Sequence, residues 1–211
     1  MFVELLEKLR CPNDHEPSPL IATASRTVDR HIVEGTLGCP VCHAEFPVSE
    51  GVVRLGESFI APMITADVLS RDRMLRVGAL LGLDDRGGLY LLDCISAYFI
   101  EELAELSPQS RFIALSGTAD FLGASGVIAG HGDRIPLAES CVRGIVLDLA
   151  TPALLGSAVK ALAPGGRLVA PATADVPEGI EILARDEANW VGEREAMPAL
   201  SKLHRAPRSS P

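Results

Sequence analysis

Three cysteines stand where this chain could hold a metal ion. Cys11 ends a short apolar stretch, and Cys39 and Cys42 form a C-x-x-C pair. Such a pair on a tight turn presents two sulfurs to one ion, and zinc takes four ligands in a tetrahedron. The sequence therefore predicts a zinc site that joins two knuckles. Paired knuckles close a site to substrate, so we expect a structural role for the metal.

The first knuckle lacks a second cysteine. Asp14 stands at the expected spacing from Cys11, His15 follows it, and His43 is an outside candidate; all three side chains can ligate zinc. The alternative is that the metal is lost and apolar packing holds the knuckles together. The candidate metal ligands are Cys11, Asp14, His15, Cys39 and Cys42.

The elements around these residues follow from apolar spacing. Phe2, Leu5, Leu6 and Leu9 recur at helical spacing and predict a short helix that runs into Cys11. Residues 32–37 predict a strand that leads to Cys39, and residues 46–55 predict a turn and a closing strand. This first block ends near Gly56.

Beyond this block the pattern alternates between strand and helix, after a connecting helix predicted over residues 65–83. Thr151 before Pro152 is typical of a helix start. Strands separated by crossover-length segments predict a parallel sheet with helices on both faces, closed by an antiparallel hairpin. The predicted strands are 89–92, 111–115, 127–129, 144–147, 167–170, 180–183 and 189–193, and the helices are 97–106 and 152–162.

Composition narrows the function classes. The formal net charge of −9 argues against a nucleic-acid surface, which needs clustered Lys and Arg, and the one basic cluster lies in the tail. Charged residues interrupt the apolar stretches, which argues against a secretory signal or a membrane helix. We therefore expect a cytoplasmic protein, in which Cys94 and Cys141 are inert core thiols.

The first block resembles a known family. The sequence runs L-L-x-x-L-x-C-P up to Pro12, C-P-x-C at residues 39–42 and F-P-V-x-x-G-V at residues 46–52. It is similar to the small zinc-ribbon proteins that activate tRNA, ribosomal RNA and release-factor methyltransferases. The resemblance implies docking on a methyltransferase. Some bacterial relatives lack the cysteines, which keeps the metal-free alternative open.

The second block resembles class I S-adenosylmethionine-dependent methyltransferases. Residues 132–146 are similar to the family's G-D-x-x-x-L-P-F-x-D-x-S-F-D-x-V stretch, and residues 163–169 to its P-G-G turn. The resemblance implies that Asp133 faces the adenine, with a turn or cap role as the alternative. It likewise implies cofactor-side positions for Asp93, which ends the first strand, and Ser116, which ends the second. Taken by itself, Asp93 is expected to cap the following helix.

The chain departs from this family where the cofactor is held. The loop after Asp93 contains no glycine, and Ile95, Tyr98 and Phe99 put bulk where backbone must approach the cofactor. At Ser116 the family places an acid that holds the ribose. Both departures argue against S-adenosylmethionine as a bound cofactor. For Asp148, after the fourth strand, a capping or solvent role is favoured over contact with substrate.

Length gives an independent indication. Between residues 170 and 180 the chain is too short for the helix that normally precedes the final hairpin. An exposed apolar flank there would favour a partner or a homodimer, unless the helix over residues 65–83 fills it. No serine or histidine stands at the spacing of a nucleophilic site, so catalytic residues stay unassigned.

The sequence thus predicts an α/β fold, in which a small zinc-ribbon-like module precedes a shortened Rossmann-like, doubly wound sheet. The predicted boundaries are 1–56 for the ribbon, 57–87 for the connecting helix, 88–195 for the methyltransferase-like domain and 196–211 for a flexible tail. The predicted function is non-catalytic: binding a protein partner, such as a methyltransferase, or a second copy. The alternative is an active S-adenosylmethionine-dependent methyltransferase with an atypical loop.

Overall fold

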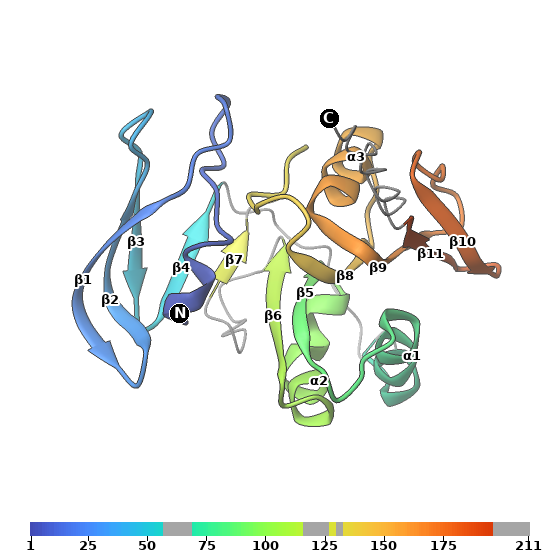
Figure 1. The fold of residues 1–211 in the computed structure, drawn as a ribbon. Coiled ribbons are helices and arrows are strands. Elements are labelled where there is room, and N and C mark those ends of the chain that lie inside the picture. The colour runs from blue at the N-terminus through green and yellow to red at the C-terminus, as the bar shows by residue number, and fades with distance from the viewer. Residues whose placement is uncertain (57–68, 116–126, 130–132, 196–211) are drawn as a thin grey trace, which may run out of the picture.

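A computed structural model shows the fold, and it describes residues 1–56, 69–115, 127–129 and 133–195. One sheet of eleven strands runs through the molecule in the order β1-β2-β3-β4-β7-β6-β5-β8-β9-β11-β10 (Figure 1). Strands β1 to β4 are antiparallel neighbours, and β7, β6, β5, β8 and β9 are parallel. The predicted mixed α/β architecture is confirmed. The predicted tail, 196–211, lies outside the described residues.

The N-terminal module is a four-stranded meander. Its strands are β1 (Ile21–Val28), β2 (His31–Gly38), β3 (Glu45–Ser49) and β4 (Val52–Leu55). The helix expected near the N-terminus is a 3-10 turn, η1 (Val3–Leu5), although Leu5 and Leu9 are buried as expected. The helix stops short because Leu9 forms a β-bridge with Leu137, which requires extended backbone.

The second module matches the predicted alternation closely. Its strands are β5 (Gly88–Asp93), β6 (Ser110–Leu115), β7 (Val127–Ala129), β8 (Val142–Val146), β9 (Leu162–Pro171), β10 (Ile180–Arg185) and β11 (Asn189–Arg194). Its helices are α1 (Arg71–Leu81), α2 (Ile100–Leu106), which follows the 3-10 turn η3 (Ser96–Phe99), and α3 (Pro152–Ala161). The final hairpin is antiparallel, as predicted.

Helices cover both faces of the parallel strands, as a doubly wound sheet requires. Helices α1 and α2 pack on one face, where Tyr90 and Phe112 are buried, and α3 packs on the other. Gly144 of β8 lets α1 approach closely, since a Cβ at this position would lie 2.7 Å from a methyl carbon of Leu81. Strand order reverses between β5 and β8, so the switch point of the sheet lies between these two strands.

Strand β4 pairs in parallel with β7 and joins the two modules into one sheet. The register aligns Val53 with Val127 and Leu55 with Ala129. Beside this joint, the Arg10 amide donates to the Pro136 carbonyl at 2.9 Å, and the Ala138 amide donates to the Lys8 carbonyl at 2.7 Å. The two modules therefore share one continuous sheet, and the domain boundary predicted at residue 56 stays a prediction.

The apolar flank expected beside the final hairpin is covered within the chain. No helix lies between β9 and β10, where every residue is described, as the length of this segment predicted. Instead the segment crosses over Trp190, which is fully buried and donates its indole N–H to the Ala174 carbonyl at 3.0 Å. The alternative that the connecting helix fills this flank is wrong, because α1 packs on the opposite face of the sheet.

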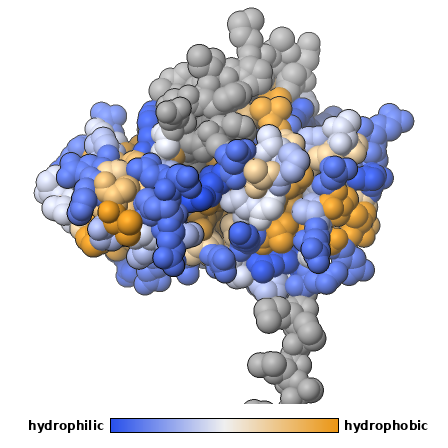
Figure 2. Space-filling model, turned by 90° about the horizontal axis from the view of Figure 1, so that it is seen from above, coloured by the Kyte–Doolittle hydropathy of each residue, from blue (hydrophilic) through white to orange (hydrophobic). Residues whose placement is uncertain are grey.

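On the face seen in Figure 2, polar residues predominate among those described. Figure 2 shows hydrophilic residues over much of one face, with apolar residues in small separate groups. Among the described residues, no helix is long and apolar enough to cross a membrane.

Candidate metal centre and ligand crevice

Cys11 and His15, in the loop before β1, converge with Cys39 and Cys42 of the β2–β3 turn. Each offers a ligand atom, and these four atoms all lie within 4.8 Å of one another. The Cys11 and Cys42 sulfurs are 3.7 Å apart, and the Cys39 sulfur lies 3.4 Å from His15 Nε2. Tetrahedral zinc with its usual bond lengths separates two sulfurs by about 3.8 Å and a sulfur from a nitrogen by about 3.6 Å. The four residues therefore fit one zinc ion.

A hydrogen bond at Nδ1 orients the His15 ring so that Nε2 can bind a metal. His15 Nδ1 lies 2.6 Å from the Glu16 carbonyl oxygen, a distance at which Nδ1–H donates to that oxygen. This hydrogen bond selects the tautomer whose Nε2 lone pair faces the Cys39 sulfur. Zinc-binding histidines commonly hold their second nitrogen in this way.

The other two predicted ligands point elsewhere. The Asp14 side chain is fully exposed and pairs with Arg134 at 3.3 Å, outside the cluster of four ligand atoms. His43 is also outside this cluster; it closes the second knuckle with a left-handed backbone, and its amide donates to the Cys39 carbonyl. Of the two choices for the first knuckle, the structure brings in His15.

The thiols differ in how readily they ionise. Burial raises the pKa of Cys11 to about 12. The backbone N–H of Ala44 lowers the pKa of the exposed Cys42 to about 6, and the Asn13 side-chain amide, 3.3 Å from the Cys42 sulfur, also lowers it. Zinc would therefore meet a thiolate at Cys42 and displace a proton from Cys11.

The crevice at the carboxyl ends of β5 and β8 is bonded within the protein. Asp93 is fully buried and accepts a hydrogen bond from the Leu149 amide at 3.1 Å. Asp148 accepts bonds from the Ser96 amide at 2.7 Å and the Ser96 hydroxyl at 3.1 Å, so it caps η3, in keeping with the capping role favoured for it. The Cys94 amide donates to the Leu115 carbonyl at 3.1 Å. These amides are therefore engaged where a glycine-rich loop would offer its donors to a cofactor.

The bulky residues after β5 are divided between core and surface. Phe99 is buried in the cluster formed with α1 and α2, while Ile95 lines a cavity of about 670 Å³. This cavity lies between α1 and the carboxyl ends of β8 and β9, and Ser96, Asp148 and Asn189 also line it. Burial raises the pKa of Asp148, and Arg73 of α1 pairs with it at 3.1 Å. The cavity is thus lined by apolar side chains such as Ile95 and Val146 and by the ion pair of Asp148 with Arg73.

The structure separates the remaining predicted cofactor residues. Asp133 is exposed and lies near the start of α3, where it accepts a hydrogen bond from the Thr151 hydroxyl at 3.4 Å. Asp133 lines a cavity between Cys11 and α3, whereas Asp93 is fully buried at the end of β5. Ser116 lies outside the described residues.

Comparison with known proteins bears on the first module. Residues 3–51 match the family model of Trm112p-like proteins. No curated protein sequence matches the chain.

Several methyltransferase structures resemble the chain weakly. The antibiotic-resistance methyltransferase Kmr is 12% identical, with a TM-score of 0.41 over 59% of this chain and 93% of that one. A methyltransferase from Silicibacter pomeroyi is 15% identical, with a TM-score of 0.41 over 58% and 88%. A chain of the Haloferax volcanii complex between the Trm112 methyltransferase activator and a methyltransferase is 12% identical, with a TM-score of 0.44 over 61% and 91%.

Two residues of the metal centre were absent from the sequence prediction. Asn13 supports the Cys42 sulfur within the Trm112p-like module, and Arg134 of the second module reaches the first knuckle. Asn13 lies inside the knuckle, so its place between Cys11 and His15 was a usable signal. Arg134 lies more than a hundred residues away in the sequence, and its spacing to the knuckle carries no signal.

Proposed function

We propose that this chain acts by binding a protein partner, with its Trm112p-like module held on its own methyltransferase-like sheet, and that it does not transfer methyl groups. The loop after β5 carries the proposal. Ser96 and Cys94 use their amides inside the protein, and the loop has no glycine through which a cofactor could approach the backbone.

The first module supports the same proposal. The resemblance implies that proteins of this type dock on methyltransferases, and here β4 pairs with β7 of the same chain. The zinc centre fits a structural role, since four protein ligands leave no open position for a substrate. Zinc held by Cys11, His15, Cys39 and Cys42 would fix the two knuckles on each other.

A titration of zinc-loaded protein with S-adenosylmethionine tests the proposal. We expect isothermal calorimetry to show no saturable heat at up to millimolar cofactor. The matched variant is Asp148→Ala, which releases the Ser96 amide; Asp85→Ala, which removes an exposed carboxylate that does not line the cavity beside Ile95, is its control. A micromolar dissociation constant for the wild-type chain would overturn the non-catalytic proposal.

The second candidate is an active S-adenosylmethionine-dependent methyltransferase. The cavity of about 670 Å³ beside Ile95 and Ser96 favours it, because its volume suits a small ligand and it lies next to the switch point of the sheet. Radiolabelled methyl transfer that is lost in Asp148→Asn and kept in Asp85→Asn would support this candidate. The native mass in solution shows whether the partner is a second copy of this chain.

A further inference from the structure

We propose that Arg134 is a positioning residue that couples the metal state of the ribbon to the segment 133–138 and to the start of α3. The proposal rests on the metal centre formed by the four ligands above. It adds a connection between that centre and the stretch in which the sequence most resembles a methyltransferase.

On the ribbon side, Arg134 binds the first knuckle at three points. Its Nη1 donates to the Asn13 carbonyl at 3.3 Å and to the His15 carbonyl at 3.0 Å. Its Nη2 donates to Asp14 at 3.3 Å. Two of these acceptors are backbone carbonyl oxygens. The contacts of the guanidinium therefore depend on the backbone conformation of the knuckle as well as on the charge of Asp14.

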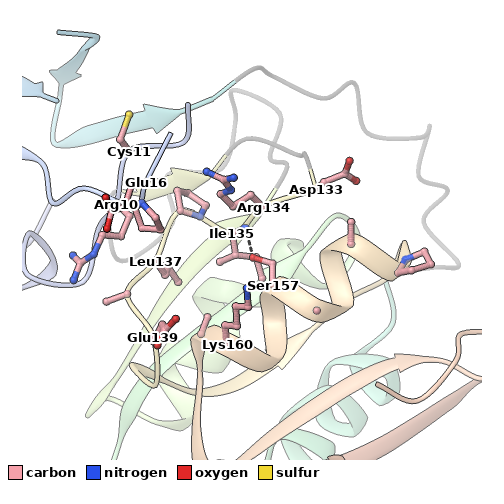
Figure 3. Close-up of a pocket in the computed structure, with 17 residues that line it drawn as sticks. Arg10, Cys11, Glu16, Asp133, Arg134, Ile135, Leu137, Glu139, Ser157 and Lys160 are labelled. Carbon is pink, nitrogen blue, oxygen red and sulfur yellow. Dashed lines mark hydrogen bonds between the residues drawn. The ribbon is translucent and has the colours of Figure 1, made fainter. Parts of the chain in front are cut away.

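On the other side, the residues flanking Arg134 contact α3, Asp133 at its N-cap and Ile135 in the middle of the helix. Asp133 accepts the Thr151 hydroxyl at 3.4 Å, and the Ile135 amide donates to the Ser157 hydroxyl at 2.9 Å. Figure 3 shows Arg134 and Asp133 at the rim of a cavity of about 830 Å³ between Cys11 and α3, with the Ile135–Ser157 bond dashed. One segment thus contacts the knuckle and the helix.

In this proposal, the bound metal keeps the Asn13 and His15 carbonyls aligned with the Arg134 guanidinium. A bound ion holds Cys11 and the His15 ring, and the backbone between them presents the Asn13 and His15 carbonyls together. Without the ion, the knuckle loses its cross-link and Arg134 loses two aligned acceptors. Residues 137 and 138 stay tied by the Leu9–Leu137 bridge and the Ala138–Lys8 bond. We therefore expect a local response that is strongest at Ile135.

Amide hydrogen exchange on the full chain, with zinc and after chelation by EDTA, tests this coupling. In the wild type we expect chelation to speed exchange at Ile135 by about fivefold or more and to change Ala138 little. In Arg134→Ala, Ile135 should exchange fast in both metal states. By reciprocity, Arg134→Ala should bind zinc at least about fivefold more weakly than the wild type does, as measured by competition with a chromophoric chelator. Arg134→Lys, which keeps the charge and loses the planar fork, should fall between the two.

Arg26→Ala is the matched control, because it removes an exposed arginine paired with Glu34 at 3.5 Å elsewhere in the same module. This control should behave as the wild type does. Zinc content by emission spectrometry separates the two levels of the argument: a chain that takes up no zinc removes both the metal centre and the coupling. Zinc uptake with equal Ile135 exchange in both metal states, or an Arg134→Ala variant that responds as the wild type does, overturns the role of Arg134 alone.

Discussion

At the residue scale, one substitution in the first knuckle defines the metal centre. Asp14 stands where the second cysteine is expected, yet its carboxylate pairs with Arg134 in solvent. His15 takes the ligand position from the next residue, and its Nδ1 contact with the Glu16 carbonyl fixes the ring. The knuckle therefore offers a Cys-His pair of candidate ligands in place of a Cys-Cys pair, with one more residue between them.

Substitution of His15 should weaken zinc binding, whereas substitution of its neighbour Asp14 should leave zinc bound. His15→Ala removes a ligand and should weaken zinc binding by more than about 100-fold, beyond the usual effect of losing an outer contact. Asp14→Ala should keep one zinc per chain, since its carboxylate lies outside the cluster. Competition with a chromophoric chelator measures both affinities. Equal losses in the two variants would contradict the assignment of His15.

Spacing alone pointed to three of these candidate ligands, Cys11, Cys39 and Cys42. It left Asp14 and His15 as alternatives, because both residue types bind zinc and only the backbone path decides which side chain turns inward. The departures in the second module were equally visible as residue types. The hydrogen bonds of Asp148 and Asp93 were not, because they join loops that lie more than fifty residues apart.

At the scale of elements, the turn between α1 and β5 is held to β8 by an ionic network. Asp84 accepts from Arg143 at 3.0 Å and from Arg86 at 2.9 Å, and Arg143 also donates to the Gly87 carbonyl. The hydrogen bond from Arg143 lowers the pKa of Asp84 to about 2. The ionised carboxylate is therefore the form that stabilises this turn.

The free energy of unfolding should depend on Asp84 in acid. A carboxyl whose pKa is lower in the folded state contributes stability above its unfolded pKa of about 4, and this contribution is lost as the pH falls towards about 2. In Asp84→Asn, the slope of the free energy of unfolding against pH should be smaller over this window. The decrease corresponds to up to about one proton taken up on unfolding. Urea unfolding at several pH values measures the slope. The adjacent, exposed Asp85→Asn is the control, and an unchanged slope in Asp84→Asn would contradict the prediction.

Helix α3 begins as its sequence predicts. The Thr151 hydroxyl accepts the Leu154 amide at 3.1 Å, and Pro152 occupies the first turn. Thr151→Ala should lower the free energy of unfolding by about 1 kcal/mol, and Thr151→Ser should restore most of it. Denaturant titration measures both variants. Equal stability of the alanine and serine variants would show that this cap contributes nothing.

The element pattern of the second module could be predicted because its strands are apolar runs and α3 begins at a cap residue followed by proline. The first helix failed, since tertiary pairing of Leu9 with Leu137 overrode its helical spacing. Sequence also could not show that β4 pairs with β7, because any strand edge offers the same backbone groups.

At the scale of the whole molecule, one apolar core includes residues from both modules. Leu9, Leu37 and Leu55 of the first module belong to the same buried cluster as Ile113 and Trp190 of the second. A shared core and a shared sheet favour cooperative unfolding of the two modules.

Leu55→Ala should therefore destabilise both modules together. Leu55 is fully buried, and its truncation should cost about 2–5 kcal/mol. Fluorescence of Trp190, the single tryptophan, reports on the second module, and thiol labelling of Cys11 and Cys39 reports on the first. Both midpoints should fall by the same amount. A Trp190 transition that keeps its wild-type midpoint would show that the modules unfold separately.

Leu183→Ala is the matched control for this comparison. Leu183 lies on the edge strand β10 and is 48% exposed. Its truncation should change stability by less than about 0.5 kcal/mol.

Because β4 and β7 belong to one chain, each meets the other at a high effective local concentration. Two surfaces on separate proteins meet at the concentrations of those proteins in the cell. Two surfaces on one chain meet at an effective concentration on the order of millimolar. A separate methyltransferase that used the edge of β4 would have to displace β7 against this local excess. A second protein would therefore have to bind elsewhere, and the ratio of ribbon to sheet is fixed at one to one by the chain itself.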